Sequence, residues 1–121
     1  MMQEIKVTVS GADLYFATVE KEKGIQAILN RMDGNAAELA VPAHIEREGS
    51  TIPVTAIGRK ALMGNRRLQI LTLPDTLAQI DDWAFAGCRR LREVTMPRGK
   101  LGKGVFQDCE ALRKIRFSDG G

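Results

Sequence analysis

Residues 54–121 repeat one pattern of apolar residues three times. Equivalent residues lie 23 apart between the first two copies and 21 apart between the last two, as in Ile57 and Ile80, Leu68 and Leu91, Leu73 and Met96, then Phe85 and Phe106, Cys88 and Cys109, Met96 and Phe117. A repeat of this length forms one coil of a solenoid, because a single copy can bury its apolar side only against its neighbours. The sequence therefore predicts three stacked coils over residues 54–121.

Each copy ends in a segment that alternates at period two, which is the pattern of a strand with one buried side. The inward positions are Leu68, Leu71 and Leu73, then Leu91, Val94 and Met96, then Leu112, Ile115 and Phe117. The positions between them project outward and are Ile70, Thr72, Glu93, Thr95, Lys114 and Arg116. We call these six outward residues the sheet face. Because solvent-facing side chains on a rigid scaffold can contact a partner, the sheet face is the first candidate binding surface.

Residues 1–53 alternate apolar and polar positions between turn-forming residues. The predicted elements are strands at Ile5–Val9, Leu14–Val19, Ile25–Met32 and Glu38–Pro42, with a hairpin turn at Glu46–Ser50. The third of these is ambiguous between a strand and a short helix, and we favour a strand because a tight turn follows it. A solenoid end exposes an apolar cross-section and a strand edge. We therefore expect residues 1–53 to be a β-rich N-terminal cap on coils 54–121, within a single structural domain.

The second copy begins with Leu77 and Ile80 and continues through Ala84-Phe85, Gly87-Cys88 and Leu91 to Val94–Pro97. This arrangement resembles the BspA-type leucine-rich repeats of bacterial surface proteins, and the resemblance covers roughly residues 39–118. It implies a mostly β, right-handed leucine-rich-repeat solenoid with short helical turns. It also implies a non-enzymatic interaction module that presents the sheet face to a protein or host-matrix partner.

The chain departs from this family pattern at three places. Leu62 stands where the family prefers Phe, and Asn65 stands where it prefers Cys. The shortened third copy contains Leu101–Gly104, which implies a tighter bend there. The segment Gly99–Gly104 superficially resembles a phosphate loop, but it lacks the four-residue gap and the Ser or Thr after Lys. We expect it to replace a solenoid strand, with glycines that accommodate the two-residue deletion.

Charge is distributed unevenly along the chain. Residues 1–53 carry 5 Lys and Arg against 8 Asp and Glu, a balance of −3, whereas residues 54–121 carry 13 against 7, a balance of +6. Four arginines share one phase of the repeat and should form a row; we call this row the arginine ridge, and its members are Arg66, Arg67, Arg89 and Arg90. Trp83 is the one plausibly exposed aromatic residue near it, packed against the arginine stems or serving as an interaction anchor.

The arginine ridge has three interpretations. A solvated basic edge is the first, an anionic protein or glycan partner the second, and nucleic acid the third, because base stacking would require more aromatic side chains. The alternative function to the sheet-face module is therefore a cytoplasmic binder of nucleic acid or anionic polymer that uses the arginine ridge.

Few residues suggest catalysis or metal binding. His44 is the single histidine and lies in a predicted cap loop, and Asp81 and Asp82 are adjacent, so that one should cap the following turn. Cys88 and Cys109 share one repeat phase and should lie close together on adjacent coils. We favour buried, reduced thiols; a disulfide is sterically feasible, and a metal site would lack CxxC spacing and a nearby histidine. We predict no catalytic residue, no cofactor and no metal site.

Compartment and assembly are constrained only indirectly. No stretch approaches the roughly 20 apolar residues of a membrane span, and the first residues lack a basic and then apolar signal region. We expect a cytoplasmic protein if the chain is complete, and a surface or secreted one if a signal peptide has been removed. The final strand Leu112–Phe117 has no coil after it, so we expect this end to pair with a second copy or to rest on a bound partner. A closed two-fold dimer is the form we favour.

Overall fold

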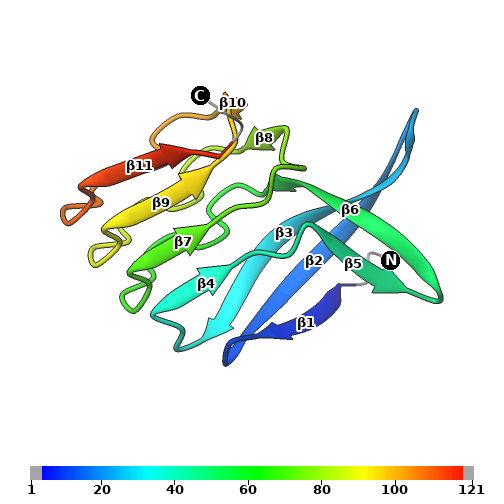
Figure 1. The fold of residues 1–121 in the computed structure, drawn as a ribbon, viewed down its shortest axis with the longest axis horizontal. Coiled ribbons are helices and arrows are strands. Elements are labelled where there is room, and N and C mark those ends of the chain that lie inside the picture. Colours follow the sequence, from blue (N-terminus) through cyan, green and yellow to red (C-terminus); the bar gives the residue numbers. More distant parts are fainter. Residues whose placement is uncertain (1–3, 119–121) are drawn as a thin grey trace.

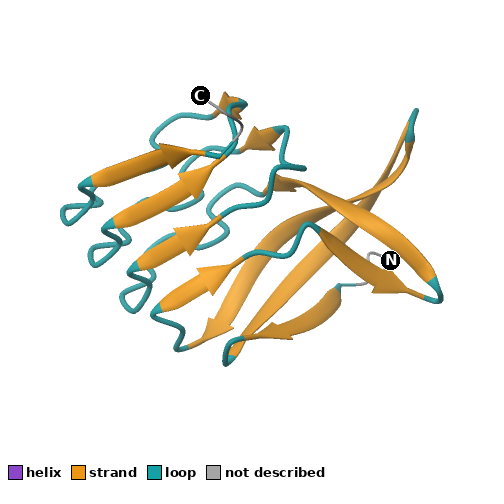
Figure 2. Cartoon of the chain, viewed as in Figure 1, coloured by secondary structure: helices purple, strands orange, loops and turns teal. Residues whose placement is uncertain are grey.

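The structure is a computed structural model that describes residues 4–118. Within this range every regular element is a strand and none is a helix (Figures 1 and 2). The strands are β1 (Ile5–Val9), β2 (Ala12–Lys21), β3 (Gly24–Gly34), β4 (Glu38–Ala40), β5 (His44–Arg47), β6 (Ser50–Ile57), β7 (Ile70–Thr72), β8 (Gln79–Ile80), β9 (Glu93–Met96), β10 (Lys100–Leu101) and β11 (Lys114–Phe117). The chain forms an all-β solenoid of about 4 turns. The predicted solenoid fold is confirmed, although the sequence predicted three coils.

The coils are built from two sheets. The first sheet has four parallel strands in the order β11-β9-β7-β4, and the second has the order β1-β2-β3-β6-β8-β10, with β5 paired to β6. Figure 1 shows β4, β7, β9 and β11 stacked side by side in one direction. Parallel strands in register carry each coil onto the next, so residues at one repeat phase form columns.

The N-terminal strands continue the second sheet. β1, β2 and β3 form an antiparallel meander, and β3 pairs in parallel with β6. The prediction of a third strand at Ile25–Met32 is confirmed by β3, and the hairpin turn at Glu46–Ser50 joins β5 to β6. β4 precedes residue 53 but already pairs with β7 in the coil sheet. The division of the chain at residue 53 stays a prediction.

The connections between the two sheets are turns that repeat their backbone geometry coil by coil. Trp83 has φ 55° and Gly87 has φ 72°, and the equivalent residues of the neighbouring coils also have positive φ: Lys60, Gly64, Gly104 and Asp108. Backbone N–H groups of one turn donate to the next, for example Leu62 to the Ala84 carbonyl at 2.8 Å. The expected short helical turns are therefore isolated turns, with i to i+3 bonds such as Ala86 N–H to Trp83 O.

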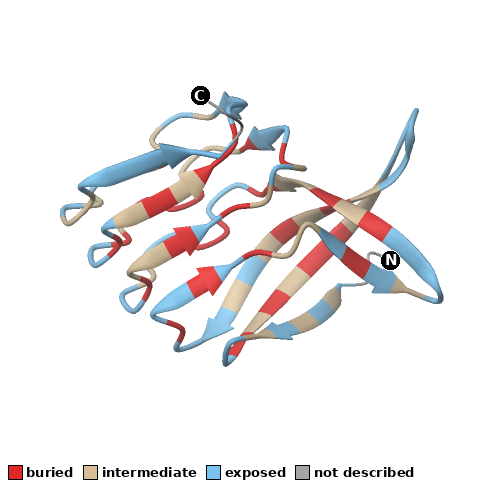
Figure 3. Ribbon diagram, in the orientation of Figure 1, coloured by how far each residue is buried: buried red, intermediate tan, exposed pale blue. Residues whose placement is uncertain are grey.

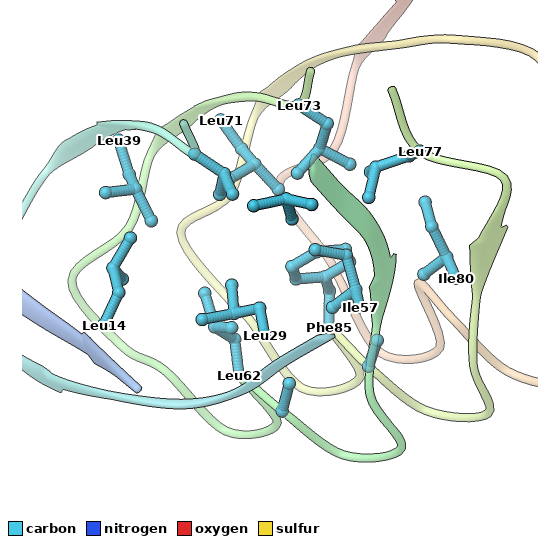
Figure 4. Packing of buried hydrophobic residues seen from close by; sticks show 14 of the residues in the cluster. Leu14, Leu29, Leu39, Ile57, Leu62, Leu71, Leu73, Leu77, Ile80 and Phe85 are labelled. Atoms are coloured by element: carbon cyan, nitrogen blue, oxygen red, sulfur yellow. The ribbon is translucent and has the colours of Figure 1, made fainter. Parts of the chain in front are cut away.

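The core lies between the two sheets and extends into the N-terminal meander. Figure 4 shows Leu14 of the meander beside Leu39 of the coil sheet, and Leu29 belongs to the same cluster as Leu71 and Phe85. The predicted inward positions of the first two copies are all 0–2 % exposed, namely Leu68, Leu71, Leu73, Leu91, Val94 and Met96. The alternation argument is therefore confirmed for these two coils.

The third coil differs. Ile115 is 43 % exposed and Phe117 is 42 % exposed, and Leu112 is only half-buried. Figure 3 shows β11 exposed along its length, whereas β7 and β9 each contain buried residues. The prediction that all three inward columns are buried is wrong for this coil, because within residues 4–118 no further coil packs against it.

The segment Gly99–Gly104 does not replace a strand, contrary to the prediction. Lys100 and Leu101 form β10, which pairs in parallel with β8. The glycine at 102 is required by close approach, because a Cβ there would lie 2.6 Å from the backbone nitrogen of Asp82. Distances this short essentially never occur for real Cβ atoms. The glycine therefore lets the shortened coil lie tightly on its neighbour.

Candidate binding surfaces

The six residues of the sheet face lie on one side of the four-stranded sheet. β9 is central, and its Glu93 is paired with Ile70 on one side and Lys114 on the other. Thr95 is paired in the same way with Thr72 and Arg116. Thr72, Lys114 and Arg116 are exposed. Ile70, Glu93 and Thr95 are half-buried. The structure thus brings all six predicted residues into two adjacent columns.

Sequence reasoning missed the first members of both columns. Glu38 and Ala40 of β4 are exposed and pair with Ile70 and Thr72, so they extend the sheet face by one strand. The signal was present, because the segment Leu39–Pro42 has the same ending as Val94–Pro97 of the second copy. The columns run from an acidic first position to basic last positions, which gives the face a charge gradient along the solenoid.

The arginine ridge forms as predicted. Its four residues, Arg66, Arg67, Arg89 and Arg90, are exposed and together line one open hollow of about 500 Å³. They lie in the turns that precede β7 and β9. The equivalent positions in the third coil are Glu110 and Ala111, so the ridge ends there.

Asn65 occupies the position in the first coil at which the other two copies have a cysteine, and it stabilises the turn in a different way. Its Oδ1 accepts hydrogen bonds from the backbone N–H groups of Arg67 and Leu68, both at 2.9 Å. In the second coil the Cys88 thiol instead donates to the Leu62 carbonyl at 3.2 Å. The amide thus stabilises the turn through its own backbone, whereas the thiol bonds to the neighbouring coil.

Trp83 packs on a different surface from the arginine ridge. The cations over its ring are Arg59, with its guanidinium carbon 5.2 Å from the ring centroid, and Lys60, with its Nζ at 5.8 Å. The prediction that it packs against the ridge stems is therefore wrong, because its own turn stacks on the turn that contains Arg59. On the other side the ring edge lies over Gly104, where a Cβ would be 2.6 Å from the indole nitrogen. Half-buried Trp83 lines an open depression of about 410 Å³.

The two cysteines are free thiols on adjacent coils. Cys88 is buried, as predicted, but Cys109 is only half-buried because it belongs to the terminal coil. Each thiol donates to a carbonyl of the preceding coil, Cys109 to that of Phe85 at 3.1 Å. Burial raises the pKa of Cys88 to about 12 and also raises the pKa of Cys109.

These thiols should react slowly and in a defined order. With thiol reagent at neutral pH, we expect Cys109 to be modified before Cys88, because the latter is fully buried and the thiolate is the reactive form. The folded state keeps Cys88 protonated while the unfolded chain ionises, so stability should fall as pH rises from about 9 towards about 12. Mass spectrometry of time-quenched samples, with Cys88→Ala and Cys109→Ala for assignment, measures the order. Rapid labelling of both, or an intact disulfide, would contradict it.

The structure does not assemble the other polar residues considered from the sequence into a cluster. His44 is exposed at the start of β5 rather than in a loop. The Asp82 carboxylate accepts from the Lys103 backbone N–H at 2.8 Å, so it links two coils rather than capping its own turn, and Asp81 accepts from the Gln79 amide. Across residues 4–118 no group of three His, Cys, Asp or Glu side chains could hold a metal ion.

Parallel strands stacked coil on coil, with a Leu, Ile and Val core repeated every 21 to 23 residues, define a leucine-rich-repeat solenoid. The family model described as "BspA type Leucine rich repeat region (6 copies)" matches residues 48–120. The chain therefore belongs to the BspA-type leucine-rich-repeat family. No curated protein sequence matches the chain significantly.

Solved structures agree with this fold. A leucine-rich cell surface protein from Faecalibacterium prausnitzii matches with a TM-score of 0.73 and 23 % identity, over 92 % of this chain and 30 % of that one. A leucine-rich repeat protein from Bacteroides capillosus matches with 0.63 and 21 % identity, over 93 % of this chain and 98 % of that one. The pneumococcal vaccine antigen PcpA matches with a TM-score of 0.54 and 15 % identity, over 97 % of this chain and 39 % of that one. The chain thus spans less than a third of the length of the first relative.

Proteins of the BspA-type family are generally non-enzymatic binding modules. Among the described residues the structure has no helix with the length and hydropathy that crossing a membrane requires.

Proposed function

We propose that this chain is a protein-binding module that presents the sheet face, extended by Glu38 and Ala40, to a protein or host-matrix partner. The observation that carries the proposal is the register of four parallel strands, which aligns outward side chains in two columns. Directly behind them lies the packed core, with Leu71 and Val94 at 0–1 % exposure. A surface whose backbone is fixed in this way loses little conformational freedom when it binds.

The distribution of charge along the columns favours a protein partner whose charges are complementary to it. Glu38 lies at one end and Lys114 and Arg116 lie at the other. The positions between them are Ile70, Glu93 and the two threonines. Complementary charges across an interface favour one orientation of the partner and raise the association rate. The mixture of half-buried apolar, hydroxyl and charged side chains resembles the composition of a non-obligate interface.

The central position of the face provides the test. We expect Thr95→Arg to weaken binding to an extracellular-matrix protein about tenfold or more, because a large cation at the centre of a contact disrupts packing there. Purified matrix proteins immobilised for surface plasmon resonance supply the probes. Thr51→Arg, the same substitution at an exposed position of β6, is the matched control and should bind like the parent chain. Unchanged affinity of the Thr95→Arg variant would contradict the assignment of the sheet face. If none of the matrix proteins tested binds the parent chain, a host-matrix partner is contradicted.

We also propose that the end of the solenoid formed by β10 and β11 is covered by a second copy of this chain. These strands are the edges of the two sheets, and three large apolar side chains are exposed on them: Leu101, Ile115 and Phe117. Arg98 covers part of this surface, since its guanidinium carbon lies 4.4 Å from the Phe117 ring centroid. A two-fold arrangement is the commonest closed assembly.

A further inference from the structure

The arginine ridge concentrates positive charge, and its four arginines form no ion pair within residues 4–118. In the part of the chain that the structure describes, the recorded ion pairs are those of Arg31 with Glu4 and Asp33, far from the ridge in sequence. None of the four ridge guanidinium groups has a carboxylate oxygen within 4.0 Å there. Four like charges around one hollow repel one another. A partner with negative charge would remove this repulsion.

The backbone beneath the ridge is held firmly. Leu68 and Leu91 follow the two arginine pairs directly and are 0 % exposed. The coils are also bonded to each other at this point, because the Arg92 N–H donates to the Gln69 carbonyl at 2.8 Å. The stems of the ridge arginines therefore start from fixed positions on two consecutive coils, about 4.8 Å apart as neighbouring strands are. Only the side-chain torsions must be ordered when a ligand binds.

The dimensions of the hollow favour a ligand with several oxyanion groups. Its volume of about 500 Å³ is large, since a water molecule occupies only about 30 Å³ of the liquid. All four cations are arginine, whose planar fork donates two parallel hydrogen bonds to one sulfate or carboxylate. No aromatic side chain lines the hollow, so stacking on nucleic-acid bases has no platform there. The hollow therefore suits a ligand with repeated oxyanion groups rather than one recognised through its bases.

We propose that the arginine ridge is a binding site for a sulfated polysaccharide, whose consecutive sulfate groups lie across Arg66 and Arg67 of one coil and Arg89 and Arg90 of the next. The site is separate from the sheet face, because it lies in the turns that precede β7 and β9 and not on the strands. The chain can thus bind a sulfated glycan and a protein at different surfaces. Heparin binding at the arginine ridge and protein binding at the sheet face can therefore be tested separately.

Heparin is the probe for this site. We expect the parent chain to bind immobilised heparin at about 0.15 M salt and to release it as salt rises, because ion pairing with exposed charges is screened. The double variant R66Q/R89Q should bind at least about tenfold more weakly. R66K/R89K keeps the charge but loses the planar fork, so it should lie between the two. Neutral dextran should not compete, and oligothymidylate of matched charge should compete less well than heparin.

A charge-matched control separates the ridge from the general basicity of the chain. K21Q/K23Q removes the same two positive charges from exposed positions at the turn between β2 and β3 and should bind heparin like the parent. Thermal unfolding of R66Q/R89Q should occur at the parent temperature or above it, because the substitution relieves like-charge repulsion.

Three results would overturn the proposal: no heparin binding at about 0.15 M salt, equal losses in the ridge and control variants, or oligothymidylate competing as well as heparin. If R66Q/R89Q does not fold, the heparin affinity of R66K/R89K tests the proposal instead. An affinity equal to that of the parent chain would exclude recognition by the guanidinium fork.

Discussion

Replacing Leu91 by Ala should lower the free energy of unfolding by about 2–5 kcal/mol. Leu91 is 0 % exposed and belongs to the core cluster between the two sheets. Its coil has another on each side, so neither neighbour can collapse into the cavity without disturbing its own hydrogen bonds to the next coil. Urea unfolding followed by circular dichroism measures the loss, with the midpoint shift interpreted at constant m-value.

Leu112→Ala is the matched control, because Leu112 occupies the same repeat phase in the third coil. That side chain is only half-buried, so the same truncation should cost less than about 2 kcal/mol. Both variants are measured at low protein concentration, so that self-association does not add stability to the third coil. Equal losses in the two variants would contradict the idea that the central coil holds the core and that the terminal coil lies at its edge.

The stacking of the coils could be predicted because repetition is a local and redundant signal. Leu71, Val94 and Ile115 recur at intervals of 23 and 21 residues, and each occurrence independently indicates the same phase. The repeat pattern does not show where a coil lies in the stack. Ile115 has the pattern of a core residue and is 43 % exposed, because burial depends on whether a neighbour is present and not on the pattern itself.

Side-chain contacts between coils were harder to predict than the coils. The contact of Trp83 with Arg59 depends on which turn packs on which, and the positive φ of the tryptophan has no signature in its own sequence environment. The sequence indicates that the glycine at 102 accommodates a deletion, but it does not indicate the close approach to the Asp82 backbone that requires a glycine there. Both depend on contacts between separate coils, which periodicity alone does not specify. The arginine ridge was predictable because its members share one phase.

The protein should self-associate through the β10 and β11 end. Light scattering across a concentration series should show the mass approach that of a dimer and then stop, because a two-fold contact closes on itself. Ile115→Lys places a charge on this exposed apolar surface and should keep the chain monomeric. Ile25→Lys is the matched control, since Ile25 at the start of β3 is exposed to a similar degree, 38 % against 43 %. It should dimerise like the parent.

Salt gives this assembly a second signature. In a two-fold contact of β11 with its copy, Lys114 and Arg116 meet the same basic residues of the other chain, and added salt screens that repulsion within about 10 Å at 0.1 M. Dimerisation should therefore strengthen with ionic strength, whereas heparin binding at the arginine ridge weakens. A strictly monomeric protein at high concentration would mean that the basic side chains of β11 and the stacking of Arg98 on Phe117 protect this edge sufficiently. Masses that keep growing beyond a dimer would instead indicate head-to-tail stacking, in which the acidic β4 end of one copy meets the basic β11 end of the next.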